Sequence, residues 1–154
     1  MIKNGTGNAK QIIIPGPPQG KARARTFYNP RLGKHQSITP NNTVLYENLV
    51  KTCYMRSHEG ECFDEDQPLE VIIYAYYEIP KSMSKKDKQA VMDGKLFPTK
   101  KPDADNIAKV VCDALNGMAY KDDKQIVNMT VLKRYAENGE PHVTVTILPM
   151  LYGE

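Results

Sequence analysis

The sequence predicts an α+β domain in which a mixed β-sheet of about four strands carries helices mainly on one face. Two periodicities lead to this class. Apolar residues alternate with other residues over 69–79 and 142–148, as in strands, and recur every three to four residues over 103–116, as in a helix. Along the chain the predicted elements follow the order β-α-β-α-α-β-β, which favours the α+β class.

A chain of 154 residues is long enough for one domain with its own core, and we expect that domain to span residues 1–154. No apolar run is as long as a membrane span, and the N-terminal residues lack the apolar segment of a signal peptide. We therefore expect a cytoplasmic protein without a membrane partner. The 3 cysteines are odd in number and show no C-x-x-C spacing, which disfavours a disulfide framework and a zinc site.

The first predicted strand covers 11–15 and is closed by Gly16-Pro17-Pro18. A basic segment with several Gly and Pro residues follows over about 16–36, and we predict that it is a mobile loop. Its cationic side chains are candidates for binding DNA phosphates: Lys21, Arg23, Arg25, Arg31 and Lys34. Phe27 and Tyr28 are candidates for stacking on unpaired bases. The charges are also compatible with a solvated surface, and the two rings with packing on the core.

A helix is predicted from Thr39-Pro40 to about His58. The pair combines a capping hydroxyl with a first-turn proline, which is typical of a helix N-terminus. We expect Leu45, Leu49 and Cys53 to form the inner ridge of this helix.

The strand predicted over 69–79 is the most regular in the sequence. Its first face consists of apolar residues, namely Leu69, Val71, Ile73, Ala75, Tyr77 and Ile79. The second face is half aromatic, so we expect an inner strand that is covered on both faces and uses its tyrosines for packing. After this strand, Ser84 is predicted to cap a short Lys-rich helix that ends near Gly94.

The C-terminal part of the chain predicts a hairpin. A strand over about 126–135 is followed by Asn138-Gly139, a strong hairpin signal, and by a strand over 142–148. In the last strand we expect Val143, Val145 and Ile147 to face the core.

The most informative stretch is the helix predicted over 103–115. Asp103 after Pro102 is a favourable N-cap residue, and Asn116-Gly117 is a typical C-terminal stop. The helical period places five apolar residues on one face for the core: Ile107, Val110, Val111, Ala114 and Leu115.

The other face of this helix is acidic. Asp105, Lys109 and Asp113 stand one above the next, and Asp122-Asp123 follow the helix in the sequence. If the chain turns back alongside the helix, these acids and Asp103 converge near its N-terminal end. Packed carboxylates repel one another unless a cation lies between them, and carboxylate oxygens suit Mg²⁺. Each acid also has an ordinary interpretation as a cap, an ion pair or a turn residue, so the composition alone leaves both interpretations open.

The charge is distributed unevenly along the chain. Residues 1–60 hold nine Lys or Arg and two acids, a net charge of +7, so the remaining residues have a net charge of −4 within the total of +3. A basic surface beside an acidic metal site is what a nuclease requires, because cations neutralise the flanking phosphates while carboxylates hold metal at the phosphate that is cut.

Two motifs carry a resemblance to a known family. The first begins at Lys101 and reads Lys-Pro-Asp-x-Asp-Asn-x-x-Lys-x-x-x-Asp-Ala-Leu-Asn-Gly; the second begins at Tyr120 and reads Tyr-Lys-Asp-Asp-x-Gln-Ile-Val. Together they resemble the signature of the RusA family of Holliday junction resolvases, which are often prophage-borne. The match runs without a gap to about Lys133.

The resemblance implies a single RusA-like endonuclease domain that acts as a homodimer in DNA recombination and repair. It implies paired symmetric nicks in four-way DNA junctions, with Mg²⁺ as the cofactor, Mn²⁺ as an alternative ion and no organic cofactor. The family's three catalytic aspartates match Asp103, Asp105 and Asp123, which together with Asp122 are the expected metal ligands, and its functional lysine matches Lys109. A junction-binding protein without catalysis and a nuclease that acts on flaps or forks are the alternatives.

Overall fold

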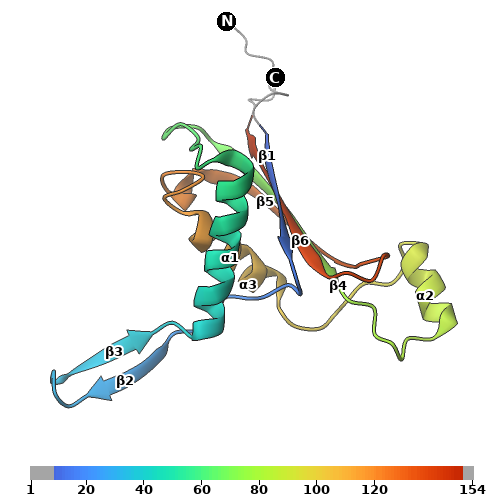
Figure 1. Ribbon diagram of the computed structural model, residues 1–154, viewed down its shortest axis with the longest axis horizontal. Helices are drawn as coiled ribbons and strands as arrows, with labels where there is room; N and C mark the ends of the chain where they lie inside the picture. The colour runs from blue at the N-terminus through green and yellow to red at the C-terminus, as the bar shows by residue number, and fades with distance from the viewer. Residues whose placement is uncertain (1–8, 151–154) are drawn as a thin grey trace, which may run out of the picture.

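The protein folds around a four-stranded mixed sheet, with the strands in the order β1-β6-β4-β5. The structure, a computed structural model, describes residues 9–150, so the ends of the predicted 1–154 domain lie outside it. Figure 1 shows the elements, whose bounds are β1 Lys10–Pro15, β2 Arg25–Asn29, β3 Lys34–Ile38, α1 Asn41–His58, β4 Leu69–Tyr77, α2 Lys85–Met92, α3 Ala104–Leu115, β5 Ile126–Tyr135 and β6 His142–Pro149. The α+β class and the predicted order of elements are confirmed.

The predicted C-terminal hairpin is wrong in its pairing. β6 pairs antiparallel with β4, and β5 pairs parallel with the other edge of β4, so β4 lies between the two strands that the turn connects. The link between them passes the end of β4, where the Ala136 N–H donates to the Tyr77 carbonyl at 2.7 Å. Because β4 is the most apolar strand, burying it between two neighbours outweighs the local preference of Asn138-Gly139 for a hairpin.

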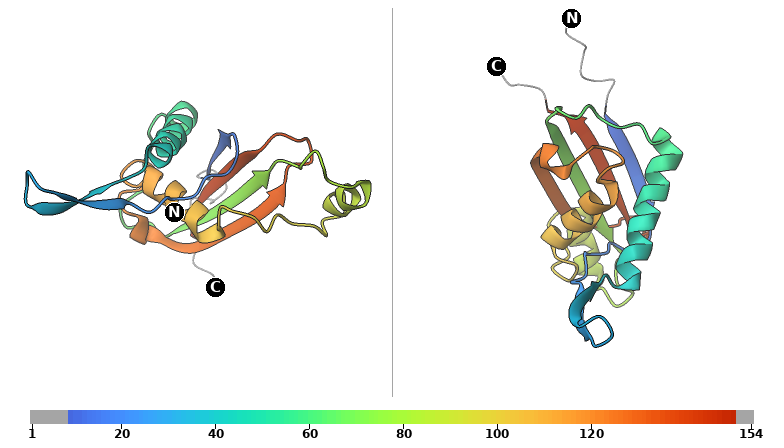
Figure 2. Two further views of the ribbon diagram at one scale, coloured as in Figure 1. Left: turned by 90° about the horizontal axis from the view of Figure 1, so that it is seen from below. Right: turned by 90° about the vertical axis from the view of Figure 1, so that its left-hand side faces the viewer.

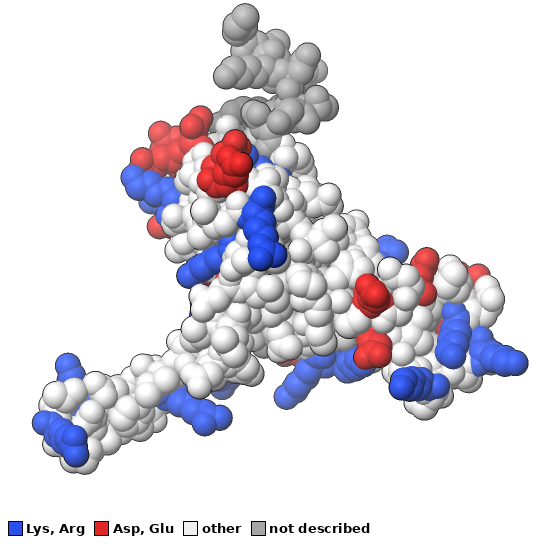
Figure 3. Space-filling model, in the orientation of Figure 1, with Lys and Arg blue, Asp and Glu red and all other residues white. Residues whose placement is uncertain are grey.

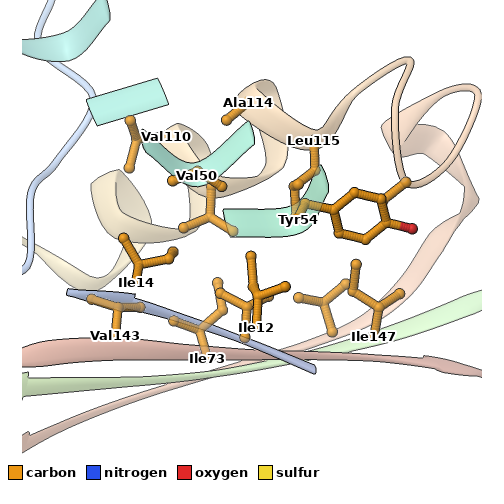
Figure 4. Close-up of a cluster of buried hydrophobic side chains, with 14 of the residues drawn as sticks. Ile12, Ile14, Val50, Tyr54, Ile73, Val110, Ala114, Leu115, Val143 and Ile147 are labelled. Atoms are coloured by element: carbon orange, nitrogen blue, oxygen red, sulfur yellow. The ribbon is translucent and has the colours of Figure 1, made fainter. Parts of the chain in front are cut away.

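Helices α1 and α3 cover one face of the sheet, which agrees with the prediction (Figure 2). The core lies between these layers, where isoleucines and valines of β1, β4 and β6 face α1 and α3 (Figure 4). The residues predicted to form the inner face of α3 are all buried. Helix α2, capped by Ser84 as predicted, lies beyond the end of the sheet. Among the described residues, no helix combines the length and apolarity needed to cross a membrane.

The buried face of α1 differs from the predicted one. Tyr46, Val50 and Tyr54 are buried, whereas Leu45 is 68% exposed. The predicted Leu49 and Cys53 only flank the core. The two tyrosines are large enough to fill the space between α1 and the sheet. The prediction gave leucine more weight than tyrosine, so it placed the neighbouring row of side chains in the core instead.

Among residues 9–150, no helix covers the opposite face of the sheet, which corrects the expectation that β4 is covered on both faces. Ile72, Tyr74 and Tyr76 of β4 are half-buried on this side. The ring of Tyr76 stacks on the rings of Tyr74 and His142, with centroid distances of 6.2 and 4.4 Å. These tyrosines therefore pack on each other and on β6, in agreement with the packing role expected of them.

The segment expected to be a mobile loop contains a second, two-stranded sheet. β2 and β3 form an antiparallel hairpin with Phe27 opposite Gln36 and Tyr28 opposite His35. Figure 1 shows it projecting away from the rest of the molecule, and we call residues 25–38 the arm. Apolar and polar residues do not alternate regularly in this segment, so the sequence lacks the usual signal for strands. Its many charges therefore led to the prediction of a loop, although the backbone forms a two-stranded ribbon.

Candidate active site

The acidic face belongs to α3, whose ends are those predicted from the sequence. Asp103 occupies the N-cap position, and Asn116 with Gly117 at a φ of 78° ends the helix. The Asp103 carboxylate makes no capping hydrogen bond, although its residue type favours one. The carboxylate at the mouth of the helix is thus not used for the helix itself.

The turn after α3 brings the second pair of acids back beside the helix. The Asn116 side-chain carbonyl accepts a hydrogen bond from the Asp123 N–H at 3.1 Å. Asp122 caps the short 3₁₀-helix over 123–125, where its carboxylate accepts from the Lys124 N–H at 2.9 Å and the Gln125 side chain accepts in return from the Asp122 N–H. These bonds fix the backbone on both sides of Asp123.

Asp123 lies beside the C-terminal half of α3, and not beside its N-terminal turn as the sequence led us to expect. It lines a shallow hollow of about 330 Å³. The other lining residues come from one side of α3 and from β5, namely Ala108, Lys109, Cys112, Asp113, Ile126 and Met129. The hollow therefore brings together Asp123 and the predicted catalytic Lys109, while Asp103 and Asp105 are exposed at the N-terminal end of α3.

The acids around α3 fall into two groups by their contacts. Within residues 9–150, no hydrogen bond or ion pair engages the carboxylates of Asp103, Asp105 and Asp123. In contrast, Asp122 caps the short helix, and Asp113 pairs with two lysines, as described below. Carboxylates without partners inside the chain are free to accept an external cation.

These free carboxylates fit a magnesium ion in the chemistry of their donors. Mg²⁺ prefers oxygen ligands and takes one or two carboxylates from a protein, with water and phosphate in the other positions. Over the described part of the chain, however, no three His, Cys, Asp or Glu side chains lie together closely enough to surround a metal ion. The expected convergence of all the acids is therefore absent from this arrangement of side chains.

The carboxylates affect the ionisable groups buried beneath them. Burial, followed by the negative charges of Asp123 and Asp113, raises the pKa of the Cys112 thiol to about 11, although a hydrogen bond from Tyr120 opposes the rise. Burial, with Asp103 as a further cause, raises the pKa of Tyr77 to about 12. The Tyr77 hydroxyl donates to the Pro102 carbonyl at 2.9 Å, next to Asp103. Both groups stay neutral at physiological pH.

The predicted DNA-binding cations lie mainly on the arm. No acid occurs between residues 16 and 38, and Figure 3 shows Lys and Arg without Asp or Glu at the far end of the arm. Phe27 and Tyr28 are 41% and 56% exposed, so their rings do not fold back onto the core. The prediction that these side chains are accessible for binding is thus consistent with their positions, except for Lys21.

Lys21 makes contacts that sequence reasoning missed. Its ammonium lies 2.5 Å from a Glu47 oxygen on α1 and 3.2 Å from an Asp113 oxygen on α3, with 24% of the side chain exposed. Glu47 was not a candidate, because it is a single acid on a helix with no motif around it. Only the packing of α1 against α3 brings these residues together.

Comparison with known proteins assigns the chain to a family. The profile of the endodeoxyribonuclease RusA family matches residues 15–148. The chain is also 48% identical over 124 residues to the uncharacterized protein YqaN of Bacillus subtilis (strain 168), over 75% of this chain and 86% of the relative. Because the family match covers almost all of the described residues, this protein belongs to the RusA family of endodeoxyribonucleases.

Proposed function

We propose that this protein is a Mg²⁺-dependent endonuclease that resolves four-way DNA junctions by paired symmetric nicks, in recombination and repair in the cytoplasm. The observation that carries the proposal is that Asp103, Asp105 and Asp123 have no partner within the described chain, in a protein of the RusA family. Acids left unpaired on and beside a well-packed helix are available for a metal ion and its phosphate ligand.

Each side chain of the site has a proposed role. Asp103, Asp105 and Asp123 are the proposed metal ligands, as the resemblance to the RusA family implies; to hold a single ion, the Asp123 carboxylate and those at the N-terminal end of α3 would have to come closer together than they lie here. The ion would supply an activated water and offset charge on the scissile phosphate. Mn²⁺ is the alternative ion. Lys109, 63% exposed at the hollow that contains Asp123, would contact the scissile phosphate. Asp122 was a fourth candidate ligand, but its capping bond favours a role in fixing the backbone of Asp123.

The arm provides the proposed contact with DNA outside the site. Its base and both of its strands carry cations, and its two exposed aromatic rings stand ready to stack on bases that are unpaired at a crossover. A side chain such as Arg25, Arg31 or Lys34 can neutralise a phosphate, and within residues 9–150 none of the three forms an ion pair.

We propose a homodimer as the active form. A four-way junction has approximate two-fold symmetry, and its resolution needs two nicks on opposite strands. Two copies related by a two-fold axis present two identical sites in the matching geometry.

The proposal is tested by cutting a synthetic mobile four-way junction, with linear duplex and flap substrates as controls. Wild type is expected to give paired nicks only with Mg²⁺. Asp105→Asn and Asp123→Asn should each lose at least a hundredfold in rate while binding the junction as tightly as wild type, because the amide removes a charged ligand but keeps the side-chain volume. Asp87→Asn on the distant α2 serves as the matched control and should cut normally.

The alternatives predict other products. Tight, salt-dependent binding with no metal-dependent nick would identify a junction-binding protein, and a preference for flaps over four-way junctions would identify a different structure-selective nuclease. An Asp105→Asn or Asp123→Asn variant that cuts at the wild-type rate would remove that residue from the site.

A further inference from the structure

The ammonium of Lys21 lies between two helices. It contacts Glu47 on α1 at 2.5 Å and Asp113 on α3 at 3.2 Å, and all three side chains are at most 25% exposed. Burial by itself would lower the pKa of Lys21, but its hydrogen bonds to Glu47 and Asp113 outweigh burial and raise this pKa above its ordinary value. Lys21 is therefore charged, and its charge is compensated inside the protein.

The chain around Lys21 is held in place by its backbone. The Lys21 N–H donates to the Asn106 carbonyl of α3 at 3.0 Å, and the Ala22 N–H donates to the Thr43 hydroxyl of α1 at 3.2 Å. Gly20 packs so closely that a Cβ there would lie 3.0 Å from the Cβ atoms of Asn106 and Pro102. The position of Lys21 is thus fixed by the backbone of residues 20–22, independently of the Lys21 side chain.

Asp113 is shared between two lysines. One carboxylate oxygen faces Lys21, and the other accepts from Lys109 at 3.3 Å. Lys21, Glu47, Asp113 and Lys109 together carry two positive and two negative charges, so the cluster is neutral. Lys109 is its most exposed member, at 63%, and the only one of the two lysines that lines the hollow with Asp123.

Removal of Lys21 would leave two carboxylates with one lysine. Asp113, no longer shared, would attract Lys109 more strongly, and Lys109 is the group proposed to contact the scissile phosphate. Because the two lysines contact different oxygens of the same carboxylate, the charge of Lys21 would weaken the hold of Asp113 on Lys109 and leave Lys109 freer to turn toward the hollow.

We propose that Lys21 is a positioning residue of the nuclease site, which acts through Asp113 on Lys109, and that it does not contact DNA. This inference rests on the proposed nuclease function and replaces the DNA-binding role expected of Lys21 from the sequence. Lys21 thereby connects the segment just before the arm to α3, the helix that carries the acids.

The experiment separates junction affinity from the rate of cutting. Lys21→Met, Lys21→Arg and, as the matched control, Lys34→Met on the arm are assayed for junction affinity at several salt concentrations without Mg²⁺, and for single-turnover cutting with saturating enzyme and Mg²⁺. Lys21→Met should cut at least tenfold more slowly, with its affinity and salt slope within twofold of wild type. Lys21→Arg should recover most of the rate, because a guanidinium can bind both carboxylates. Lys34→Met should weaken binding and reduce the salt slope, yet cut normally once saturated.

A second measurement depends on neither DNA nor catalysis. Urea unfolding of Lys21→Met, Asp113→Asn and the double variant should show that the two effects are not additive, because both single variants break the same ion pair. The same unfolding curves verify that Lys21→Met is folded under the conditions of the cleavage assay.

Three results would overturn the positioning role while leaving the nuclease intact: normal cutting by Lys21→Met, a Lys21→Met variant that loses affinity and salt slope but cuts normally at saturation, or strictly additive unfolding energies. The proposed function fails differently, through a wild-type protein that cuts no branched DNA, and the role of Lys21 in cutting would then fail with it.

Discussion

Gly20 shows how little room there is between the basic segment and the acidic helix. Its backbone lies against Asn106 in the first turn of α3 and against Pro102 ahead of the helix, where a methyl group would lie 3.0 Å from the Cβ atoms of both. Few side-chain carbons in proteins approach one another so closely, so a larger residue at this position requires its neighbours to move.

Gly20→Ala is therefore expected to destabilise the protein. The added carbon forces the segment away from α3, and overpacking of this kind costs about 1–3 kcal/mol. The free energy of unfolding in urea measures the loss, and Gln19→Ala at the exposed neighbouring position provides the control. A stability equal to that of wild type would mean that the segment moves without cost.

Individual residues differed in how well the sequence revealed them. Asp103, Asp105, Lys109 and Asp123 stood out because they lie in two short motifs that follow one another in the sequence, although their roles stay a prediction. The contact of Lys21 with Glu47 joins residues 26 positions apart and depends on the packing of two helices, so no local pattern contains it. The sequence could not reveal that the Asp103 carboxylate makes no capping hydrogen bond, because an aspartate at this position is expected to make one.

Local signals predicted the ends and the buried face of α3, but for α1 they predicted only where the helix runs. α3 has a clear apolar face, and every residue predicted for its interior is buried. In α1, apolar side chains lie on several faces, so the tyrosines in the core could be identified only from the sheet that they cover.

The arm is the element whose proposed role in DNA binding is easiest to isolate, because it projects from the body of the protein. Reversing two charges at its base, in Arg23→Glu/Arg25→Glu, should weaken binding to the junction and lower the slope of log affinity against log salt by about 1 for each phosphate that the variant no longer neutralises. Thermal melting should change little, since both side chains are exposed. Unchanged affinity and slope in a folded variant would show that Arg23 and Arg25 do not contact DNA.

At the scale of the whole molecule, the sequence predicted the class and the order of elements, but not the order of strands in the sheet. The turn signal at Asn138-Gly139 is local, whereas the position of β6 depends on which strands compete for the edges of β4. That competition is decided by burial across the whole sheet, which no window of sequence contains.

Buried tyrosines make the folded protein sensitive to alkali. Burial raises the pKa of Tyr54 and of Tyr77 to about 12, from about 10 in an unfolded chain. Above pH 10 the unfolded chain therefore holds fewer protons than the folded one, so these groups contribute stability that is present below pH 10 and is lost as the pH rises toward 12. Burial likewise raises the pKa of Cys112 from about 9 to about 11, so the loss of stability begins near pH 9.

The melting temperature should consequently fall steeply between pH 9 and 12, together with a rise in tyrosinate absorbance near 295 nm. Tyr54→Phe should have a lower melting temperature at neutral pH, because it lacks the hydroxyl that donates to the Glu61 carbonyl in wild type. The melting temperature of this variant should then fall less steeply as the pH rises. Parallel pH profiles for wild type and Tyr54→Phe would contradict the assignment to Tyr54.

The parallel pairing of β4 with β5 has a consequence for synthesis of the protein. Parallel neighbours need a long crossover, and here the crossover contains α3, so Asp103 and Asp105 lie before the point of closure and Asp123 lies at it. A ribosome-bound chain that ends within α3 at or after Asp105 already contains two of these acids but lacks both Asp123 and the strand that follows it. The metal site proposed above would therefore be complete only once the chain has been made through Asp123 and β5 has paired with β4.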